Sequence, residues 1–281
     1  MDTRRFRFAV LLLAGPALLY SRPDAVEAQR SDDRIFHSTQ AANLPTAETL
    51  NAGLWMFEIS HRFLPAVSEG ADALWGLDGP VYNRLGLSYA PTDRLVVGLL
   101  RSNLDDNLEL DVKAGLLEGR LGEIRYKAGV MAGGAINFGA TPDSTATVLV
   151  EDDESQLYAQ AMLNASFGDR LALGVVPTGF YNLRIRDVEP ASTFALGLHG
   201  QYYSDGALSF LAEWILSVES VDYPNDGVSF GMEIETRGHF FKVLLTNQVR
   251  MNPTQFLVGT PFEYGSDAWR LGVNITRVLS F

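Results

Sequence analysis

The sequence predicts an all-β protein: a closed antiparallel up-and-down transmembrane β-barrel of about 12 strands, after a cleaved signal peptide. One observation behind this is a series of long segments in which apolar and polar residues alternate, the period of a strand with one face in each environment. Another is that short and long connections alternate between those segments, which is typical of outer-membrane barrels. A third is that the alternation runs to the final residue, Phe281.

The first 28 residues are predicted to be the signal peptide. Three arginines within the first seven residues precede an apolar run over 8–20, and Val-Glu-Ala at 26–28 supplies small residues before a cleavage point. A membrane anchor is the alternative, but a glycine and a proline interrupt the run, which is too short to span a bilayer as a helix. Residues 1–28 are therefore expected to be removed on export.

The mature chain is predicted to have two parts. Residues 29–52 form a periplasmic N-terminal extension, and residues 53–281 form the barrel. The extension contains the polar stretch IFHSTQAANLPTAETL, which includes His37. Two placements are open for it, one in the periplasm and one in which it tucks into the lumen as a small plug.

The strands follow from strict alternation, which is clearest over 107–117. Leu108, Leu110 and Val112 fall on one face there, while Glu109 and Asp111 fall on the other. Segments of about 9–11 residues suit a tilted bilayer crossing. The least regular predicted strands are 94–101, apolar on both faces, and 170–181, interrupted by Pro177. The predicted strands are 53–63, 81–90, 94–101, 107–117, 123–137, 156–167, 170–181, 193–203, 207–217, 227–236, 239–247 and 268–281.

The connections differ in length according to the strand that they follow. A soluble β-sandwich has no reason for such segregation, whereas a membrane barrel has brief periplasmic turns and longer outward loops. Tight turns are predicted at 91–94, 118–122, 168–170, 204–206 and 236–238. Outward loops are predicted at 64–80, 138–155, 182–192, 218–226 and 248–267, with a short one at 102–106.

Aromatic residues near the strand ends are expected in the two interfacial girdles of the barrel. Phe281 is assigned to the periplasmic girdle, because the last strand of a closed barrel pairs with the first. A C-terminal strand ending in Phe resembles the signal read by the bacterial barrel-assembly machinery, which is the expected partner. The interface residues are Trp55, Phe57, Trp214, Trp269 and Phe281, with Tyr126, Phe167 and Tyr202 as further candidates.

Several stretches resemble a bacterial outer-membrane β-barrel family of unknown function, domain of unknown function 5777. They are FEISHRF (57–63), GLDG (76–79), RLGLSYAPTDRLVVGLLRS (84–102), MEIETRGHFFKVLLTN (232–247) and WRLGVNITRV (269–278). The resemblance spans most of the mature chain and implies an outer-membrane-type barrel in a Gram-negative bacterium. It implies no substrate and no catalytic residue.

The polar face of the strands is expected to line the lumen with intermingled charges that form cross-strand ion pairs. A barrel of about 12 strands is narrow, so the lumen is expected to be partly occluded. This favours a narrow channel or transporter for small polar solutes; the alternative is a non-conducting barrel with a structural, adhesion or partner-binding role. The lumen-facing network is Glu58, Arg62, Arg84, Glu109, Asp111, Lys113, Arg125, Lys127, Glu213, Glu233, Glu235, Lys242 and Arg270.

The charge balance limits the partners. The formal net charge of −12 argues against nucleic acid, since phosphate binding needs an excess of Lys and Arg. Much of the acid lies in the outward loops, above all in EDDE at 151–154. That rim either holds divalent cations that bridge to lipopolysaccharide or is an ordinary solvated charge run. Outer-membrane lipids and lipopolysaccharide are the expected surroundings.

No enzymatic activity, cofactor or metal site is expected. The chain has no cysteine, so disulfides and thiolate metal sites are excluded. Outer-membrane phospholipases use Ser, His and Asn on the outer wall. Ser60 and His61 are neighbours and therefore lie on opposite faces, while His199 has no serine two residues later. The pattern needed for that chemistry is missing.

Overall fold

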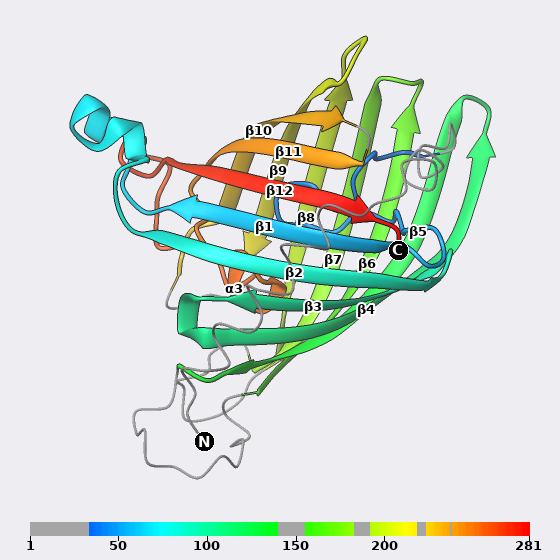
Figure 1. Cartoon of the computed structure of the whole chain (residues 1–281), viewed down its shortest axis with the longest axis horizontal. Helices are drawn as coiled ribbons and strands as arrows, with labels where there is room; N and C mark the ends of the chain where they lie inside the picture. Colours follow the sequence, from blue (N-terminus) through cyan, green and yellow to red (C-terminus); the bar gives the residue numbers. More distant parts are fainter. Residues whose placement is uncertain (1–33, 140–154, 183–191, 218–222, 237) are drawn as a thin grey trace.

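Twelve antiparallel strands form one closed barrel, as predicted, in the computed structural model of the chain (Figure 1). The structure describes residues 34–139, 155–182, 192–217, 223–236 and 238–281, so the signal peptide predicted for 1–28 lies outside the described residues. The strands are β1 (Trp55–Phe63), β2 (Val81–Thr92), β3 (Leu95–Ser102), β4 (Asn107–Leu121), β5 (Ile124–Asn137), β6 (Ser155–Phe167), β7 (Leu171–Tyr181), β8 (Ser192–Tyr203), β9 (Leu208–Ser217), β10 (Gly227–Thr236), β11 (His239–Thr246) and β12 (Arg270–Leu279).

Closure comes from the pairing of the first strand with the last. β1 lies between β2 and β12, with Trp55 opposite Tyr89 on one side and opposite Leu279 on the other (Figure 1). Every strand therefore has a hydrogen-bonded neighbour on both edges. A sheet without free edges is what permits strands to cross a lipid bilayer.

The predicted strands match the observed ones closely, including the two with irregular patterns. Pro177 sits within β7 opposite Leu196, so the proline does not end the strand. The largest boundary error is in β4, which continues to Leu121, so that the turn predicted over 118–122 contracts to the two residues before β5. Gly122 has φ +61°, a left-handed conformation that glycine adopts without steric cost.

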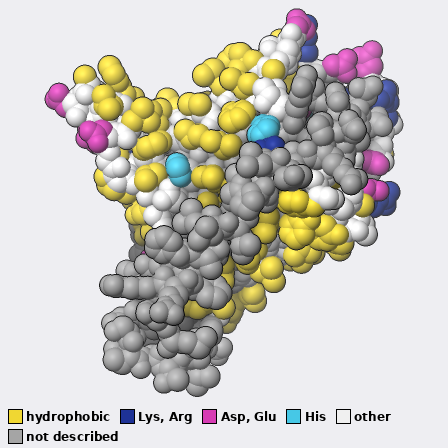
Figure 2. Space-filling model, viewed as in Figure 1, with side chains coloured by type: hydrophobic (Ala, Val, Ile, Leu, Met, Phe, Trp, Pro, Cys, Tyr) yellow, Lys and Arg dark blue, Asp and Glu magenta, His cyan; other side chains and the backbone are white. Residues whose placement is uncertain are grey.

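The outer surface of the barrel is apolar. Hydrophobic side chains cover much of the face shown in Figure 2, and acidic and basic side chains gather towards its ends. Leu157 and Val243, for example, are 56% and 50% exposed. Such a belt would be unfavourable in water and is stable against lipid chains.

In the described part of the chain, three short helical segments lie in connections between strands. They are η1 (Val67–Gly76), η2 (Leu104–Asp106) and α3 (Pro253–Phe256). No helix in the described ranges is long and apolar enough to cross a membrane. η1 projects beyond the end of the barrel wall and exposes Trp75, whereas every residue of α3 is buried (Figure 1).

The connection that carries α3 does not lie where the sequence predicted it. The whole of 248–267 was expected as an outward loop, but residues 247–249 and 251–260 are buried, and the segment folds into the barrel. We call residues 247–260 the inward loop. Its sequence explains the placement, because Arg250 is its only charged residue and amide and apolar side chains make up most of the rest.

Candidate functional site

The lumen is entered from one end by the N-terminal extension. Residues 34–54, which we call the plug hairpin, run into the barrel and turn back, with Gln40 and Pro45 in an antiparallel bridge. The turn is closed by a hydrogen bond from Ala41 N to Leu44 O of 2.8 Å. Of the two placements that the sequence left open for this extension, the described part therefore occupies the lumen and not the periplasm.

Contacts at both ends of the plug hairpin show that it enters from the short-turn side. His37 N donates to the Tyr203 hydroxyl, and the His37 ring stacks on the Tyr203 ring at 4.2 Å. Tyr203 is the last residue of β8, before a short turn. On the returning arm, Ala52 N donates to Asp93 Oδ1 at 2.7 Å, in the turn between β2 and β3.

The inward loop enters from the opposite, long-loop end. Gln255 Nε2 donates to Leu104 O at 2.9 Å, in the connection between β3 and β4. Thr254 Oγ1 donates to Glu109 Oε2 at 2.9 Å, and Tyr158 donates to the other oxygen of the same carboxylate at 2.8 Å. The Glu109 side chain therefore anchors this loop to the wall.

The plug hairpin and the inward loop meet inside the barrel. Leu44 and Ala47 from the hairpin belong to the same buried apolar cluster as Phe256 and Leu257 from the loop. Wall residues complete the cluster, among them Met162, Val176 and Ile215, all fully buried. The lumen is therefore occupied by chain from both ends, a stronger occlusion than the partial one expected from wall side chains alone.

Glu213 on β9 holds the apex of the plug hairpin. Its carboxylate accepts hydrogen bonds from Asn43 N at 2.8 Å, Leu44 N at 2.7 Å and Asn43 Nδ2 at 3.0 Å. Glu213 is 2% exposed, so these bonds form away from bulk water. Hydrogen bonds to an ionised acceptor are stronger than neutral ones.

Lys242 on β11 binds the first arm of the hairpin, which runs into the barrel. Its ammonium donates to Ser38 Oγ at 3.0 Å, to Ala41 O at 2.8 Å and to Gln40 O. It also lies 3.2 Å from Glu233 Oε2, and both partners of this ion pair are 1% exposed. The pair supplies the compensating charge that a buried ammonium needs.

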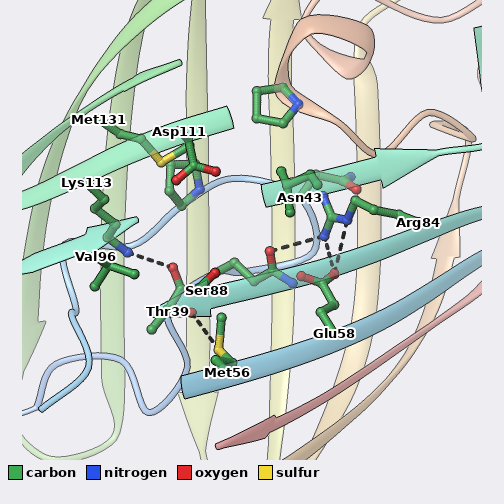
Figure 3. Close-up of a pocket in the computed structure, with 14 residues that line it drawn as sticks. Thr39, Asn43, Met56, Glu58, Arg84, Ser88, Val96, Asp111, Lys113 and Met131 are labelled. Carbon is green, nitrogen blue, oxygen red and sulfur yellow. Dashed lines mark hydrogen bonds and ion pairs between the residues drawn. The ribbon is translucent and has the colours of Figure 1, made fainter. Parts of the chain in front are cut away.

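Arg84 on β2 joins the two segments that fill the lumen. Its guanidinium donates to Gln40 Oε1 of the plug hairpin at 3.2 Å and to Met251 O of the inward loop. The same group forms an ion pair with Glu58 on β1, with Nε donating at 3.1 Å (Figure 3). A planar group with five donors is well suited to such a junction.

Arg62 on β1 also binds the apex of the hairpin. Its Nη2 donates to Asn43 Oδ1 at 2.9 Å, and its Nη1 donates to Asn274 Oδ1 on β12 at 2.6 Å. Asn274 in turn donates to Ala42 O at 2.8 Å. Arg62 is fully buried, so it is a structural ligand of the hairpin apex.

The hairpin contributes charges of its own near the short-turn end. Glu48 pairs with Lys127 at 2.9 Å, and its Oε1 accepts from Ile35 N at 2.8 Å. His37 Nδ1 lies 2.6 Å from Glu235 Oε2. Burial lowers the pKa of the Arg34 guanidinium, and the nearby Glu48 carboxylate acts in the opposite direction.

Part of the expected network of cross-strand ion pairs is present. Within the described residues, the ion pairs Glu58–Arg84 and Glu233–Lys242 each join two members of the predicted set. Most of the others bind the hairpin or the inward loop instead. Arg125 donates to Ser166 Oγ near the short turns, and Arg270 lies at the far end with its guanidinium 3.5 Å from the Phe262 ring centre.

A cavity of about 70 Å³ remains between the plug hairpin and the wall. Asp111 and Lys113, from β4, lie on its border, and Lys113 Nζ donates to Thr39 O of the hairpin at 3.0 Å (Figure 3). Glu58 and Arg84 line the same space. Two carboxylates and two cations therefore face it, with no excess of either sign.

The sequence missed several residues that shape the lumen. The inward loop, Glu48 and the wall side chains Asn164 and Tyr158 were not singled out. The inward loop has only one charged residue, whereas the outward loops are acidic. This difference is a sequence feature that predicts a buried position for the inward loop. Ala47 N donates to Asn164 Oδ1, but nothing in the sequence links residues so far apart.

His199 lies on the lumen side of β8, with its ring 4.8 Å from that of Phe36 in the plug hairpin. Neither ring nitrogen has a hydrogen-bond partner in the described part of the chain. Ser60 and His61 lie on opposite faces, since Ser60 is fully buried and His61 is partly exposed on the outer side. No group of three or more His, Asp or Glu residues suited to a metal occurs among the described residues.

The predicted interface aromatics lie on the outer side of the barrel. Trp214 is 44% exposed and Phe281 is 65% exposed. Trp55 packs edge-on against Phe281 at 6.4 Å, beside the closure of the barrel, and Trp269 contacts Phe230 at 6.0 Å. The acidic stretch 151–154 lies outside the described residues.

Comparison with known proteins gives a family and a set of remote structural relatives. The profile described as "Membrane bound beta barrel domain (DUF5777)" matches residues 36–279. No curated protein sequence matches the chain. A crystal structure of NanC porin is similar at 8% identity, covering 81% of this chain and 99% of that one, with a TM-score of 0.47.

Two further structures illustrate the range of the remote relatives. An outer-membrane channel from Pseudomonas putida F1 is 15% identical over 83% of this chain and 98% of that one, with a TM-score of 0.45. Outer membrane phospholipase A from Escherichia coli is 11% identical over 92% and 98%, with a TM-score of 0.40. These likenesses are too remote to carry an argument about function.

Proposed function

The chain belongs to the membrane-bound β-barrel domain family, and we propose that it is a plugged outer-membrane channel that admits small polar solutes when the plug hairpin is displaced. It is a barrel of the bacterial outer membrane, in keeping with the family description, the closed sheet and the apolar exterior. The proposal concerns what the lumen of that barrel does.

The observation that supports the proposal is the polarity of the wall side chains that bind the plug hairpin. The wall groups that hold its apex are charged or polar side chains: Glu213, Lys242 and Arg62. They bind mainly backbone groups of the hairpin, and water can replace such partners if the hairpin moves. Displacement would therefore expose these charged groups to water, beside the apolar wall residues that Leu44 covers.

Deletion of the hairpin tests the proposal directly. A variant lacking residues 34–50 is expected to give large, persistent conductance steps in planar bilayers, whereas the full mature chain stays closed with rare openings. Correct folding of both proteins is checked by their circular dichroism and protease resistance. A folded, inserted deletion variant that remains electrically silent would contradict the proposal that displacement of the plug hairpin opens the barrel.

A reversible tether provides a second test that does not rely on a deletion. The chain has no cysteine, and a Cβ built at Gly197 on β8 would lie 3.1 Å from Leu44 Cγ, so a Leu44→Cys and Gly197→Cys pair is within reach of a disulfide. Oxidation is expected to abolish the openings and reduction to restore them. The Leu44→Cys single variant is the control for the loss of the leucine.

The second candidate is a non-conducting barrel, and the many hydrogen bonds to the hairpin favour it. If the hairpin never leaves, the lumen is a filled core and the function lies on the surface. The exposed side chains of η1, including Leu74 and Trp75, are then the first place to look for a partner. The deletion and the tether distinguish the two candidates, since only a channel responds to both.

We further propose that the protein is not an enzyme of the phospholipase type. The support is the position of His199, which packs against Phe36 inside the barrel and is 5% exposed. A lipid ester bond at the outer wall is out of reach of that ring. Purified protein is expected not to hydrolyse phospholipid; hydrolysis that disappears in a His199→Ala variant would contradict this.

A further inference from the structure

The cavity beside the plug hairpin is large enough for a small solute. Its volume is about 70 Å³, and a water molecule needs roughly 10–15 Å³ on the same measure. The space therefore holds about five water molecules, or a solute of about as many non-hydrogen atoms. Hairpin residues Thr39, Gln40 and Asn43 form one side of it, residues of β1 to β5 form the other, and Pro253 of the inward loop also lines it (Figure 3).

Asp111 presents to this cavity a carboxylate that accepts no hydrogen bond within the described ranges. It is 8% exposed, and the Lys113 and Arg84 cations act on it electrostatically without forming a direct ion pair with it. Glu58, by contrast, is matched by Arg84 and by the Ser60 hydroxyl. A buried carboxylate that accepts no hydrogen bond is costly, so the arrangement suits the N–H donors of an ammonium group of a ligand.

The position of the Asp111 carboxylate is made possible by a glycine on the neighbouring strand. A Cβ at Gly98 would lie 2.6 Å from Asp111 Oδ2 and 2.8 Å from Oδ1, so the carboxylate occupies the space above that residue. Any side chain at position 98 would displace it. The glycine thus sets where a ligand cation would bind.

Lys113 supplies the opposite charge on the same face of β4. Its ammonium has three donors, and one hydrogen bond, to Thr39 O, is formed in the described structure. Residues two apart on a strand are roughly 6.6–6.8 Å apart along it. A carboxylate near Lys113 and an ammonium near Asp111 can therefore belong to one small molecule.

We propose that the cavity binds a small zwitterionic solute, with its ammonium group on Asp111 and its carboxylate on Lys113. The balance of two acids and two bases around the cavity fits a ligand with no net charge. Because the hairpin forms one side of the site, bound ligand stabilises the plugged state. The site exists whether or not the barrel conducts, so the inference goes beyond the proposed function.

Calorimetric titration of the purified mature chain in detergent tests the inference, with glycine as the probe. Ethylammonium and acetate, which carry one of its two charged groups each, are the comparison ligands. Glycine is expected to bind, and each half-ligand about tenfold more weakly or worse, because it leaves one charged group of the site unmatched. Equal binding of ethylammonium and glycine would overturn the zwitterion assignment, as would no glycine binding at all.

Two variants locate the site. Asp111→Asn removes the charge, and Gly98→Ala keeps the charge but pushes the carboxylate aside; both are expected to lower glycine affinity about tenfold or more. Glu118→Gln, whose side chain is 62% exposed and lies outside the cavity, is the matched control. If Asp111→Asn fails to fold, the glycine affinity of the Gly98→Ala variant still tests the proposed site.

Unchanged glycine affinity in folded Gly98→Ala protein would overturn the proposed site. Conductance of the variant lacking residues 34–50 is recorded separately. Glycine binding to the full mature chain together with a silent deletion variant would contradict only the channel, whereas conductance of the deletion variant without glycine binding to the full chain would contradict only the site.

Discussion

Leu44 of the plug hairpin packs directly over Gly197 on β8. A Cβ at Gly197 would lie 2.5 Å from Leu44 Cδ2 and 2.6 Å from Cδ1, closer than any carbon contact permits. Leu44 is fully buried there, within the apolar cluster that joins the hairpin to the inward loop. The absence of a side chain at position 197 therefore seats the tip of the hairpin.

Gly197→Val is accordingly expected to displace the hairpin without breaking the barrel. Overpacking a filled site costs about 1–3 kcal/mol, and the hairpin can relieve the clash by moving. Hydrogen exchange at residues 40–47 is expected to accelerate while exchange in the strands stays unchanged. Gly206→Ala, in a turn with nothing within 4 Å of the new Cβ, is the matched control. Unchanged exchange at 40–47 would contradict this role for Gly197.

Glu213→Gln is expected to loosen the hairpin apex through its hydrogen bonds. The substitution removes the charge and turns one acceptor oxygen into a donor that faces the Asn43 and Leu44 amides. A loss of about 1–3 kcal/mol in the free energy of hairpin docking is expected. Protease cleavage within the hairpin measures this change, and Glu123→Gln, in the exposed turn between β4 and β5, should leave it unaltered. Equal cleavage of Glu213→Gln and wild-type protein would count against the anchoring role.

Lys242→Met is expected to destabilise the protein more than the double variant Lys242→Met, Glu233→Gln. The single change leaves the Glu233 carboxylate buried without its cation, a loss of about 3–5 kcal/mol. Neutralising both partners removes that penalty, so the double-mutant cycle should give a favourable coupling energy. Unfolding in urea with lipid vesicles present supplies the free energies. Strict additivity of the two substitutions would show that the pair is not coupled.

Trp214 is expected to lie against lipid, and its fluorescence can test this. In a variant that keeps only Trp214, with the other three tryptophans changed to Phe, lipids brominated on their acyl chains should quench the emission strongly. A variant that keeps only Trp75, in η1 beyond the barrel wall, should be quenched less. Stronger quenching of Trp75 than of Trp214 would contradict the assigned position of the membrane.

Local periodicity is the reason that so much of the barrel could be predicted. Alternation along β4 assigns Leu110 to the lipid face and Asp111 to the lumen from the sequence of that strand alone. The length of each connection indicates whether it lies on the periplasmic or the outward side. Together with the alternation, these lengths predict a closed sheet whose termini lie at the short-turn end. Even Pro177 did not alter the result, because neighbouring residues of β7 retain the pattern.

The occupation of the lumen followed from no local pattern. The contact between Asn43 and Glu213 joins residues 170 positions apart, and that between Thr254 and Glu109 joins residues 145 apart. The length of the connection over 248–267 predicts an outward loop. Length alone carries no information about contacts inside the lumen.

The sequence by itself determined a membrane barrel and which side chains face its interior, because a period of two residues encodes the two faces of a strand. The tertiary structure alone decided what those inward side chains bind. Their charges are matched mainly by the plug hairpin and the inward loop, since these segments place backbone amides and carbonyls within hydrogen-bonding distance of side chains that the strand spacing keeps apart.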